Sequence, residues 1–246
     1  MNNASILERI LDAHGGRTLW ERTRAIEAVI SARGALFTLK RRPVLDHMTV
    51  TALAHEPRFL FHDYLAAGRT GELTGNDEVR ILGDGERVLE RRSNPRAAFG
   101  GPGKFFRWDA LDFVYFGGYA TWNYLVAPFL FLFEGIVCEV LEPPQALPAA
   151  WTRLRVTFPP ALPTHCATQD FYFDEHYRLR RLDYVAEVVG GWARAAHLCE
   201  EYRDFDGFRA PTRRRVFPLF AGDRPLPFPT LVAIDVHSIR LIPSGT

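Results

Sequence analysis

Apolar and polar residues alternate along most of this chain, in short runs separated by Gly, Pro, Asn or Asp. An alternation with a period of two residues predicts strands that bury one face. We expect strands at residues 26–33, 48–53, 59–65, 79–82, 87–90, 153–158, 166–173, 179–189, 192–202, 211–217 and 231–242. The dipeptide Asp84-Gly85, between two such runs, predicts a tight two-residue hairpin.

Three segments follow a helical period instead. Apolar residues recur three and four positions apart in 5–13, which is followed by Gly15-Gly16, a common end for a helix. A second short helix is expected at 17–23, and a third begins near Trp108 and ends before Pro128.

These elements predict an α+β fold, with an antiparallel sheet curled into a half-barrel over N-terminal and central helices. We expect the helices at about 5–23 and 108–128 to cover the concave face of the sheet. Prolines cluster from Pro143 to Pro163 and could mark a boundary, but a strand pattern resumes at 153. We therefore expect residues 1–246 to form one half-barrel domain.

The central segment contains 21 residues without a charge, from Phe113 to Phe133. That length could span or dock on a bilayer. However, Gly117-Gly118 and Pro128 interrupt it, and its aromatic amphiphiles lie in the middle rather than at the ends. A buried helix is favoured, and membrane contact is the alternative.

Two turns predict the register of residues 164–199. A hairpin centred on Gly190-Gly191 would pair Tyr184 with His197 and Glu187 with Arg194. A second turn, centred on Glu175-His176, would pair Asp170 with Arg181.

Both turns assign the same residues to the same faces of the sheet, because side chains alternate between the faces. The face predicted to meet solvent carries the charged residues of these strands. The opposite face is mostly apolar, and four alanines there leave volume unfilled. Four neutral polar residues share this inner face: His165, Gln169, Tyr184 and His197.

Polar groups without partners inside a protein are costly, so these four must bond one another, water or a ligand. One interpretation is a satisfied core network beneath the aromatic central segment. The other is a lined pocket. If the protein is an enzyme, the pocket gives His165 or His197 as general base and Tyr184 as acid or oxyanion donor. The residues expected to contact the ligand are Gln169, Phe171, Ala186, Ala195, Tyr119 and Trp122.

Composition narrows the function class. The formal net charge is +1, which argues against a protein that mainly grips nucleic-acid phosphates. The three cysteines are too few and too scattered for a disulfide framework. With no secretory signal at the N-terminus, they favour a cytoplasmic protein.

Sequence motifs for cofactors and metals are lacking. The segment Gly100–Phe105 lacks the first glycine and the final Ser/Thr of a phosphate loop. There is no nucleophile elbow, and no His or Cys spacing that binds zinc. We expect no cofactor and no metal.

Several stretches resemble a known group of proteins. They are the run I-L-D-A-H-G-G at Ile10–Gly16 with Trp20, the run Tyr115–Leu125 with Pro128-Phe129, Thr164-His165 before Tyr172, and Leu182-Asp-Tyr before Gly190-Gly191. Together they resemble uncharacterised bacterial proteins similar to the lipoprotein-carrier (LolA-like) half-barrel superfamily. The resemblance implies a curved sheet wrapped over helices around an apolar cavity, and it specifies no reaction.

Three functions follow as hypotheses. The first is binding of a hydrophobic small molecule of lipid, polyketide or terpenoid type. The second is a cofactor-independent cyclase, isomerase or dehydratase acting on such a molecule. The third is membrane-surface docking through residues 113–133. The sequence does not indicate the oligomeric state.

Overall fold

The computed structural model describes residues 3–220 and 223–245. Within these residues the α-helices are α1 (Asn3–Ala13), α2 (Arg17–Glu21), α3 (Ala35–Leu39) and α4 (Ala110–Val126). Short 3₁₀ helices are η1 (Asp84–Glu86), η2 (Pro95–Gly100), η3 (Pro102–Phe105) and η4 (Phe129–Leu132).

Strands are the commonest regular element of the described chain. They are β1 (Thr23–Arg33), β2 (Leu45–Leu53), β3 (Arg58–Phe61), β4 (Thr70–Thr74), β5 (Glu78–Leu82), β6 (Val88–Ser93), β7 (Val137–Leu141), β8 (Thr152–Thr157), β9 (Thr168–Phe173), β10 (Leu179–Val185), β11 (Arg194–Phe205), β12 (Phe208–Pro218) and β13 (Val232–Pro243). The predictions from the sequence omitted α3, β4 and β7.

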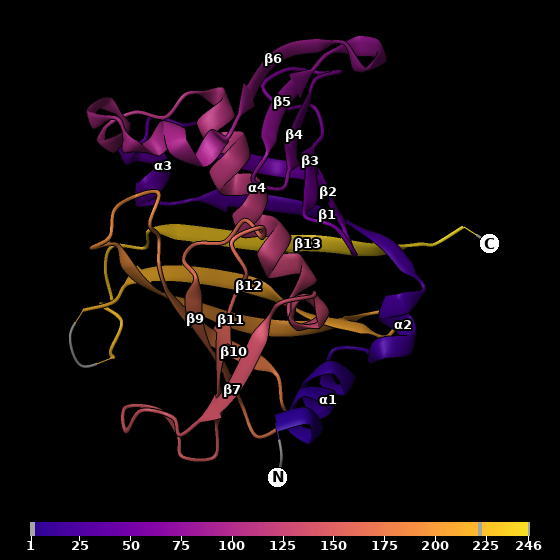
Figure 1. The fold of residues 1–246 in the computed structure, drawn as a ribbon, viewed down its shortest axis with the longest axis vertical. Helices are drawn as coiled ribbons and strands as arrows, with labels where there is room; N and C mark the ends of the chain where they lie inside the picture. The colour runs from indigo at the N-terminus through magenta and orange to yellow at the C-terminus, as the bar shows by residue number, and fades with distance from the viewer. Residues whose placement is uncertain (1–2, 221–222, 246) are drawn as a thin grey trace.

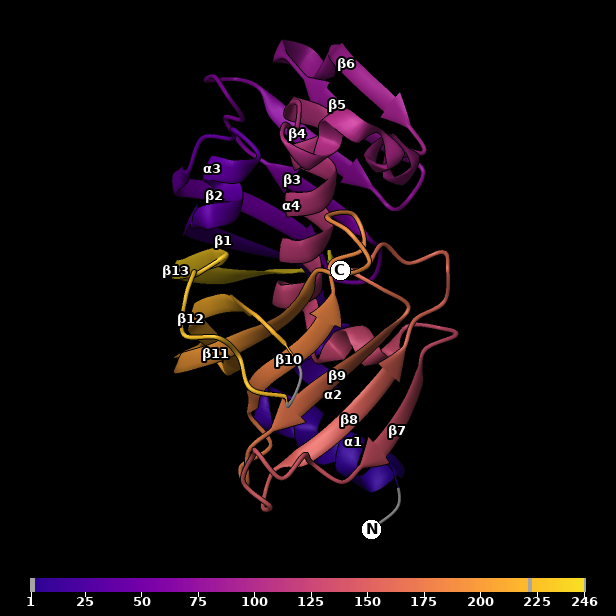
Figure 2. The same cartoon turned by 90° about the vertical axis from the view of Figure 1, so that its left-hand side faces the viewer.

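In the described residues these thirteen strands form one antiparallel sheet in the order β6-β5-β4-β3-β2-β1-β13-β12-β11-β10-β9-β8-β7. The N-terminal and C-terminal halves join where β1 pairs with β13. β6 and β7 are the two edges, so the sheet is open. Its curvature round the central helix is visible in Figures 1 and 2. The predicted α+β half-barrel is confirmed.

Helix α4 lies in the connection between the two sheet edges, β6 and β7, and crosses the sheet between them (Figure 1). Asp109 and Asp112 begin it with a capping box, in which each side chain accepts from the other's backbone N–H. The helix ends at Val126, and its C-cap Ala127 is extended because Pro128 follows.

The uncharged central segment is part of the core. No residue from Phe113 to Phe133 is exposed. Gly117 and Gly118 let the helix approach β3 and β4, since a Cβ on either would lie 3.2 Å from Phe61 or Leu73. Of the described helices, none is long and apolar enough to cross a bilayer.

The predicted registers around β10 are wrong by two residues. Tyr184 pairs with Ala195 rather than His197, and Leu182 with His197. At this turn the carbonyl of Ala186 accepts from Val189 and Gly190, so the turn forms one position earlier than predicted. Within β9, β10 and β11 the inward-facing residues are nevertheless as predicted, because a shift of two residues preserves the alternation.

The turn between β9 and β10 also differs. Arg181 pairs with Tyr172 rather than with Asp170, since a register irregularity interrupts β10 between Leu179 and Arg181. The turn itself is shaped by Asp174, whose carboxylate accepts from the backbone of His176 and Arg178.

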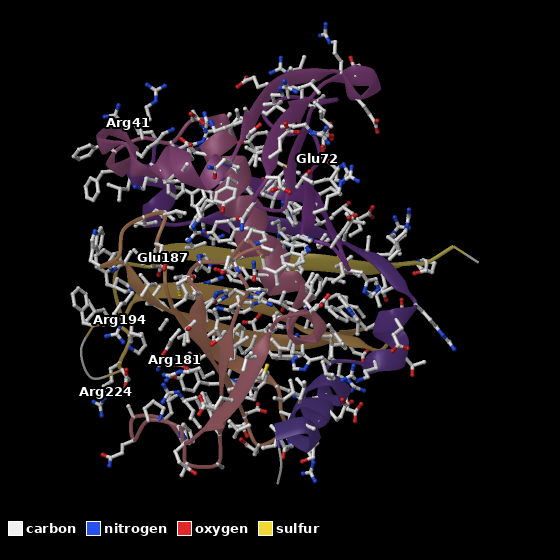
Figure 3. All side chains as sticks on the ribbon, in the orientation of Figure 1. Arg41, Glu72, Arg181, Glu187, Arg194 and Arg224 are labelled. Atoms are coloured by element: carbon white, nitrogen blue, oxygen red, sulfur yellow. The ribbon has the colours of Figure 1, made fainter. Side chains whose placement is uncertain are left out.

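The predicted cross-strand ion pairs are wrong as a consequence. Arg181 instead forms an ion pair with Asp183, and Glu187 forms one with Arg96. The Nη2 atom of Arg194 lies 3.8 Å from Oδ1 of Asp223. Arg181, Glu187 and Arg194 are labelled in Figure 3.

The hairpin at Asp84-Gly85 joins β5 and β6 as expected, but its loop is longer than two residues. Leu82 pairs with Val88, and η1 lies between them. Gly85 and Glu86 both have positive φ, at 63° and 59°.

Candidate functional site

An apolar cavity of about 530 Å³ opens between α3, α4 and the strands β10 to β13. That volume is within the range of small-molecule sites, about 300–1,000 Å³. Its wall consists of Ala35, Leu36, Leu39, Phe116, Tyr184, Ala186, Val189, Trp192, Ala193, Arg194, Ala195, Val216, Pro218, Leu219, Phe220, Pro229, Leu231 and Val232. Hydrophobic side chains make up most of this wall, so the cavity suits an apolar molecule.

Small residues create the volume on the sheet side. Ala186 and Ala195 are buried on the concave face, beside Tyr184. A larger side chain at either position would extend into the cavity. The predicted excess of alanine on this face therefore coincides with empty space.

The cavity opens to solvent beside exposed apolar side chains. Trp192 is 68% exposed and Phe220 is 63% exposed, and both are part of the wall. Large apolar groups usually avoid such exposure unless a ligand or partner covers them. They give an apolar path from the surface to the interior.

A second, smaller cavity of about 50 Å³ adjoins the first. The two cavities share four wall residues: Leu36, Phe116, Tyr184 and Val232. Tyr124, Lys40 and Arg42 belong to the wall of the smaller cavity alone. The phenol of Tyr184 therefore stands at the junction of the two spaces.

Behind Tyr184 a chain of hydrogen bonds runs into the core. Tyr184 Oη is 3.0 Å from Tyr124 Oη, which is 2.7 Å from His165 Nε2. His165 Nδ1 is in turn 3.2 Å from Tyr119 Oη. The His165 and Tyr184 rings stack with centroids 3.9 Å apart.

This series of hydrogen-bonded side chains has one more donor proton than it has hydrogen bonds. A neutral imidazole and three phenols carry four protons, and three hydrogen bonds join them. One O–H is left over. Of the two ends of the chain, Tyr184 is the one that faces open volume. The arrangement can therefore offer a hydrogen bond to a molecule in the cavity.

Burial keeps this cluster uncharged. Desolvation, with a smaller effect from the charge of Arg96, lowers the pKa of His165 to about 3. Desolvation likewise raises the pKa of Tyr184 and Tyr124 well above the ordinary value for tyrosine. At neutral pH these groups exchange hydrogen bonds without carrying charge.

His197 differs from His165, although both are buried. Neither ring nitrogen has a hydrogen-bond partner among the described residues. The ring packs edge-on against Tyr124, with centroids 4.3 Å apart. Desolvation, followed by the charge of Arg214, lowers the pKa of His197 well below its usual range.

The structure thus separates the residues expected to form the site. Tyr184, Ala186 and Ala195 line the larger cavity. His165 lies one layer behind Tyr184, and His197 packs beside Tyr124. Neither histidine lines either of these two cavities.

The other expected ligand contacts lie in the surrounding core. Gln169 donates to the carbonyl of Cys166, and Phe171 packs edge-on against Phe131. Tyr119 bonds His165, and Trp122 donates its indole N–H to the carbonyl of Leu53.

Sequence reasoning missed Tyr124 and helix α3. Tyr124 follows Phe116 and Ala120 at intervals of four, a spacing that places all three on one helix face. That signal was readable within the helix expected near 108–128. Helix α3 is five residues long, too short for a periodic pattern.

Within residues 3–220 and 223–245, no group of three or more His, Cys, Asp or Glu side chains could hold a metal ion. Burial raises the pKa of the Cys166 and Cys199 thiols.

Comparisons with known proteins support the fold. No family model matches the chain, and no curated protein matches it in sequence. Among solved structures it is similar to a LolA superfamily protein from Nitrosomonas europaea, with 10% identity and a TM-score of 0.54 over 98% of this chain and 94% of the other. A DUF1329 family protein from Desulfovibrio piger aligns with 10% identity and a TM-score of 0.48, over 97% and 92% of the two chains. The similarity to the LolA superfamily protein shows that the chain has a LolA-like fold.

Proposed function

We propose that this protein binds a hydrophobic small molecule, of lipid, polyketide or terpenoid type, in the cavity beside Tyr184. The observation that carries the proposal is the 530 Å³ apolar cavity with an exposed aromatic mouth. The LolA-like fold agrees with it, since an apolar interior under a curved sheet is what the resemblance implies. The cytoplasmic location expected from the sequence stays a prediction.

Binding accounts for the cavity better than catalysis does. A general base must come within hydrogen-bond reach of its substrate, and neither His165 nor His197 lines the cavity. Tyr184 does line it, but burial raises the pKa of its phenol. A phenol that retains its proton serves as a hydrogen-bond donor to a ligand. In this proposal Tyr184 orients the ligand, and Tyr119, Tyr124 and His165 hold Tyr184.

Membrane docking through residues 113–133 receives less support, because none of those residues is exposed. An exposed apolar mouth is still compatible with loading from a lipid surface.

The test is a titration with a fluorescent fatty acid, using Ala195→Leu as the variant and Ala167→Leu as the control. Ala195 is buried in the cavity wall, whereas Ala167 is exposed. We expect saturable binding that Ala195→Leu weakens and Ala167→Leu leaves unchanged. Binding that Ala195→Leu does not alter would count against the cavity, and so would the absence of any binding.

A further inference from the structure

Two cationic side chains form part of the wall of the smaller cavity. Lys40 immediately follows α3, and its side chain is 1% exposed. Arg42 lies two residues later and is half-buried. Both contribute to the wall that Tyr184 shares between the two cavities.

Lys40 has no carboxylate partner among the described residues. Its Nζ donates to the backbone carbonyls of Lys104 and Phe105, at 3.0 and 2.8 Å. The ammonium also lies 5.0 Å from the centre of the Trp108 ring. Desolvation by burial lowers the pKa of Lys40.

Arg42 is also without a carboxylate in the described chain. One of its terminal nitrogens lies 3.5 Å from Tyr64 Oη, and its guanidinium lies over the Phe113 ring. Its Nε is buried and has no hydrogen-bond partner within residues 3–220 and 223–245. A buried donor left unsatisfied is costly, so this nitrogen is a candidate for an anionic ligand.

The two acidic side chains at the start of α4 already have cationic partners. Asp109 bonds Arg92 at 2.7 Å and Lys104 at 3.1 Å. Asp112 bonds Arg92 at 2.7 Å and also pairs with Lys104. These two carboxylates therefore leave Lys40 and Arg42 without a counter-charge.

We propose that the ligand is an anionic amphiphile whose carboxylate lies in the smaller cavity between Lys40 and Arg42. Its apolar chain passes Tyr184 into the larger cavity and toward Trp192. The smaller space, at about 50 Å³, admits a head group the size of a few water molecules, which suits a carboxylate better than a bulky head group. This inference rests on the proposed function and adds the charge and orientation of the ligand.

The experiment compares hexadecanoic acid with its methyl ester by displacement of a neutral fluorescent probe, 1-pyrenebutanol. We expect the acid to bind about tenfold more tightly than the ester, the difference that one charge-assisted hydrogen bond provides. In Arg42→Met that preference should fall to about twofold or less, while affinity for the ester stays within about twofold of the parent protein.

Lys40→Met is the second variant, and Arg41→Met is the control. Lys40 also holds the backbone of η3, so each variant is first checked for an unchanged far-ultraviolet spectrum and cooperative unfolding. Arg41 is exposed and labelled in Figure 3, and its replacement removes the same charge beside the site without touching the cavity. Should Lys40→Met fail to fold, Arg42→Met alone decides.

The outcomes separate the two proposals. If acid and ester bind equally well, the anionic head group is wrong and the hydrophobic site stands. A preference that survives in Arg42→Met, or one lost equally in Arg41→Met, also overturns the assignment. If neither compound binds, both proposals fail.

Discussion

The imidazole of His165 lies face to face with the phenol ring of Tyr184, with the ring planes only 4° apart. The same Tyr184 is bonded through its hydroxyl to Tyr124, which also reaches His165. Stacking fixes the plane of the phenol, and the hydrogen bond fixes the position of its oxygen. The polar group presented to the cavity is therefore held in place before any ligand arrives, which reduces the entropic cost of binding.

Replacing the stacked imidazole should destabilise the protein. His165→Phe removes both links to Tyr119 and Tyr124 and leaves two buried hydroxyls with fewer partners. We expect the free energy of unfolding to fall by about 2–4 kcal/mol, from two lost hydrogen bonds and the desolvated hydroxyls. Urea denaturation followed by tryptophan fluorescence measures this, and a loss below about 0.5 kcal/mol would contradict the network.

Replacing His197, which is also buried, should not destabilise the protein. His197→Phe keeps the edge-on contact with Tyr124 and removes two nitrogens that have no partner in the described chain. The free energy of unfolding should be unchanged or rise by about 1 kcal/mol, because an unsatisfied polar group is no longer buried. A loss as large as that of His165→Phe would mean that His197 makes hydrogen bonds in solution, for example to water.

Stability should fall with mild acid. Desolvation by burial lowers the pKa of His14 to about 4, that of His165 to about 3, and that of His197 well below 6.5. Below pH 6.5 the unfolded chain takes up protons at these three sites while the folded chain does not. Each histidine then lowers the free energy of unfolding by about 1.4 kcal/mol per pH unit. The free energy of unfolding therefore keeps its full value above pH 6.5 and decreases as the pH falls toward 4.

Urea midpoints between pH 7 and pH 5 test this loss, since carboxylates stay largely ionised in that window. His197→Phe should show a shallower dependence than the parent protein, because one of the three groups is gone. A midpoint that does not change between pH 7 and pH 5 would contradict the buried neutral histidines.

Affinity should increase with the length of an apolar ligand until the cavity is full. Each methylene transferred from water to the apolar wall contributes about 0.8 kcal/mol, close to a fourfold gain in affinity. We expect this increment along a series of saturated acids, followed by a plateau once the chain reaches Trp192 and Phe220. Isothermal titration calorimetry provides the series, and an affinity independent of chain length would contradict an apolar binding site.

Several features of the fold were predictable because they depend on local periodicity. The alternation of residues in β9, β10 and β11 assigned the correct faces, and it placed His165, Tyr184 and His197 inside. Gly15-Gly16 correctly marked the end of α1, where both glycines have positive φ. Such features depend only on residues close together in the sequence, so they can be predicted from it.

The register and the site were not predictable in the same way. Tyr177 has a positive φ, and a register irregularity interrupts β10. Both affect the pairing at the turn between β9 and β10, and residue type alone reveals neither. The contact between Tyr124 and His165 joins α4 to the segment before β9, 41 residues apart. Ala167, one of the four alanines that the alternation placed on the inner face, is exposed and lies just before the first residue of β9. Such relations depend on tertiary packing, which determines which inward-facing residues meet.

The most direct test of the cavity is a crystal structure with hexadecanoic acid that carries bromine at its terminal carbon. Bromine scatters anomalously, so its position can be located independently of the protein model. The account predicts one bromine peak inside the larger cavity, near Ala186, Ala195 and Trp192. A cavity without bromine, in crystals whose only bromine peaks lie on the outer surface of the sheet, would contradict it.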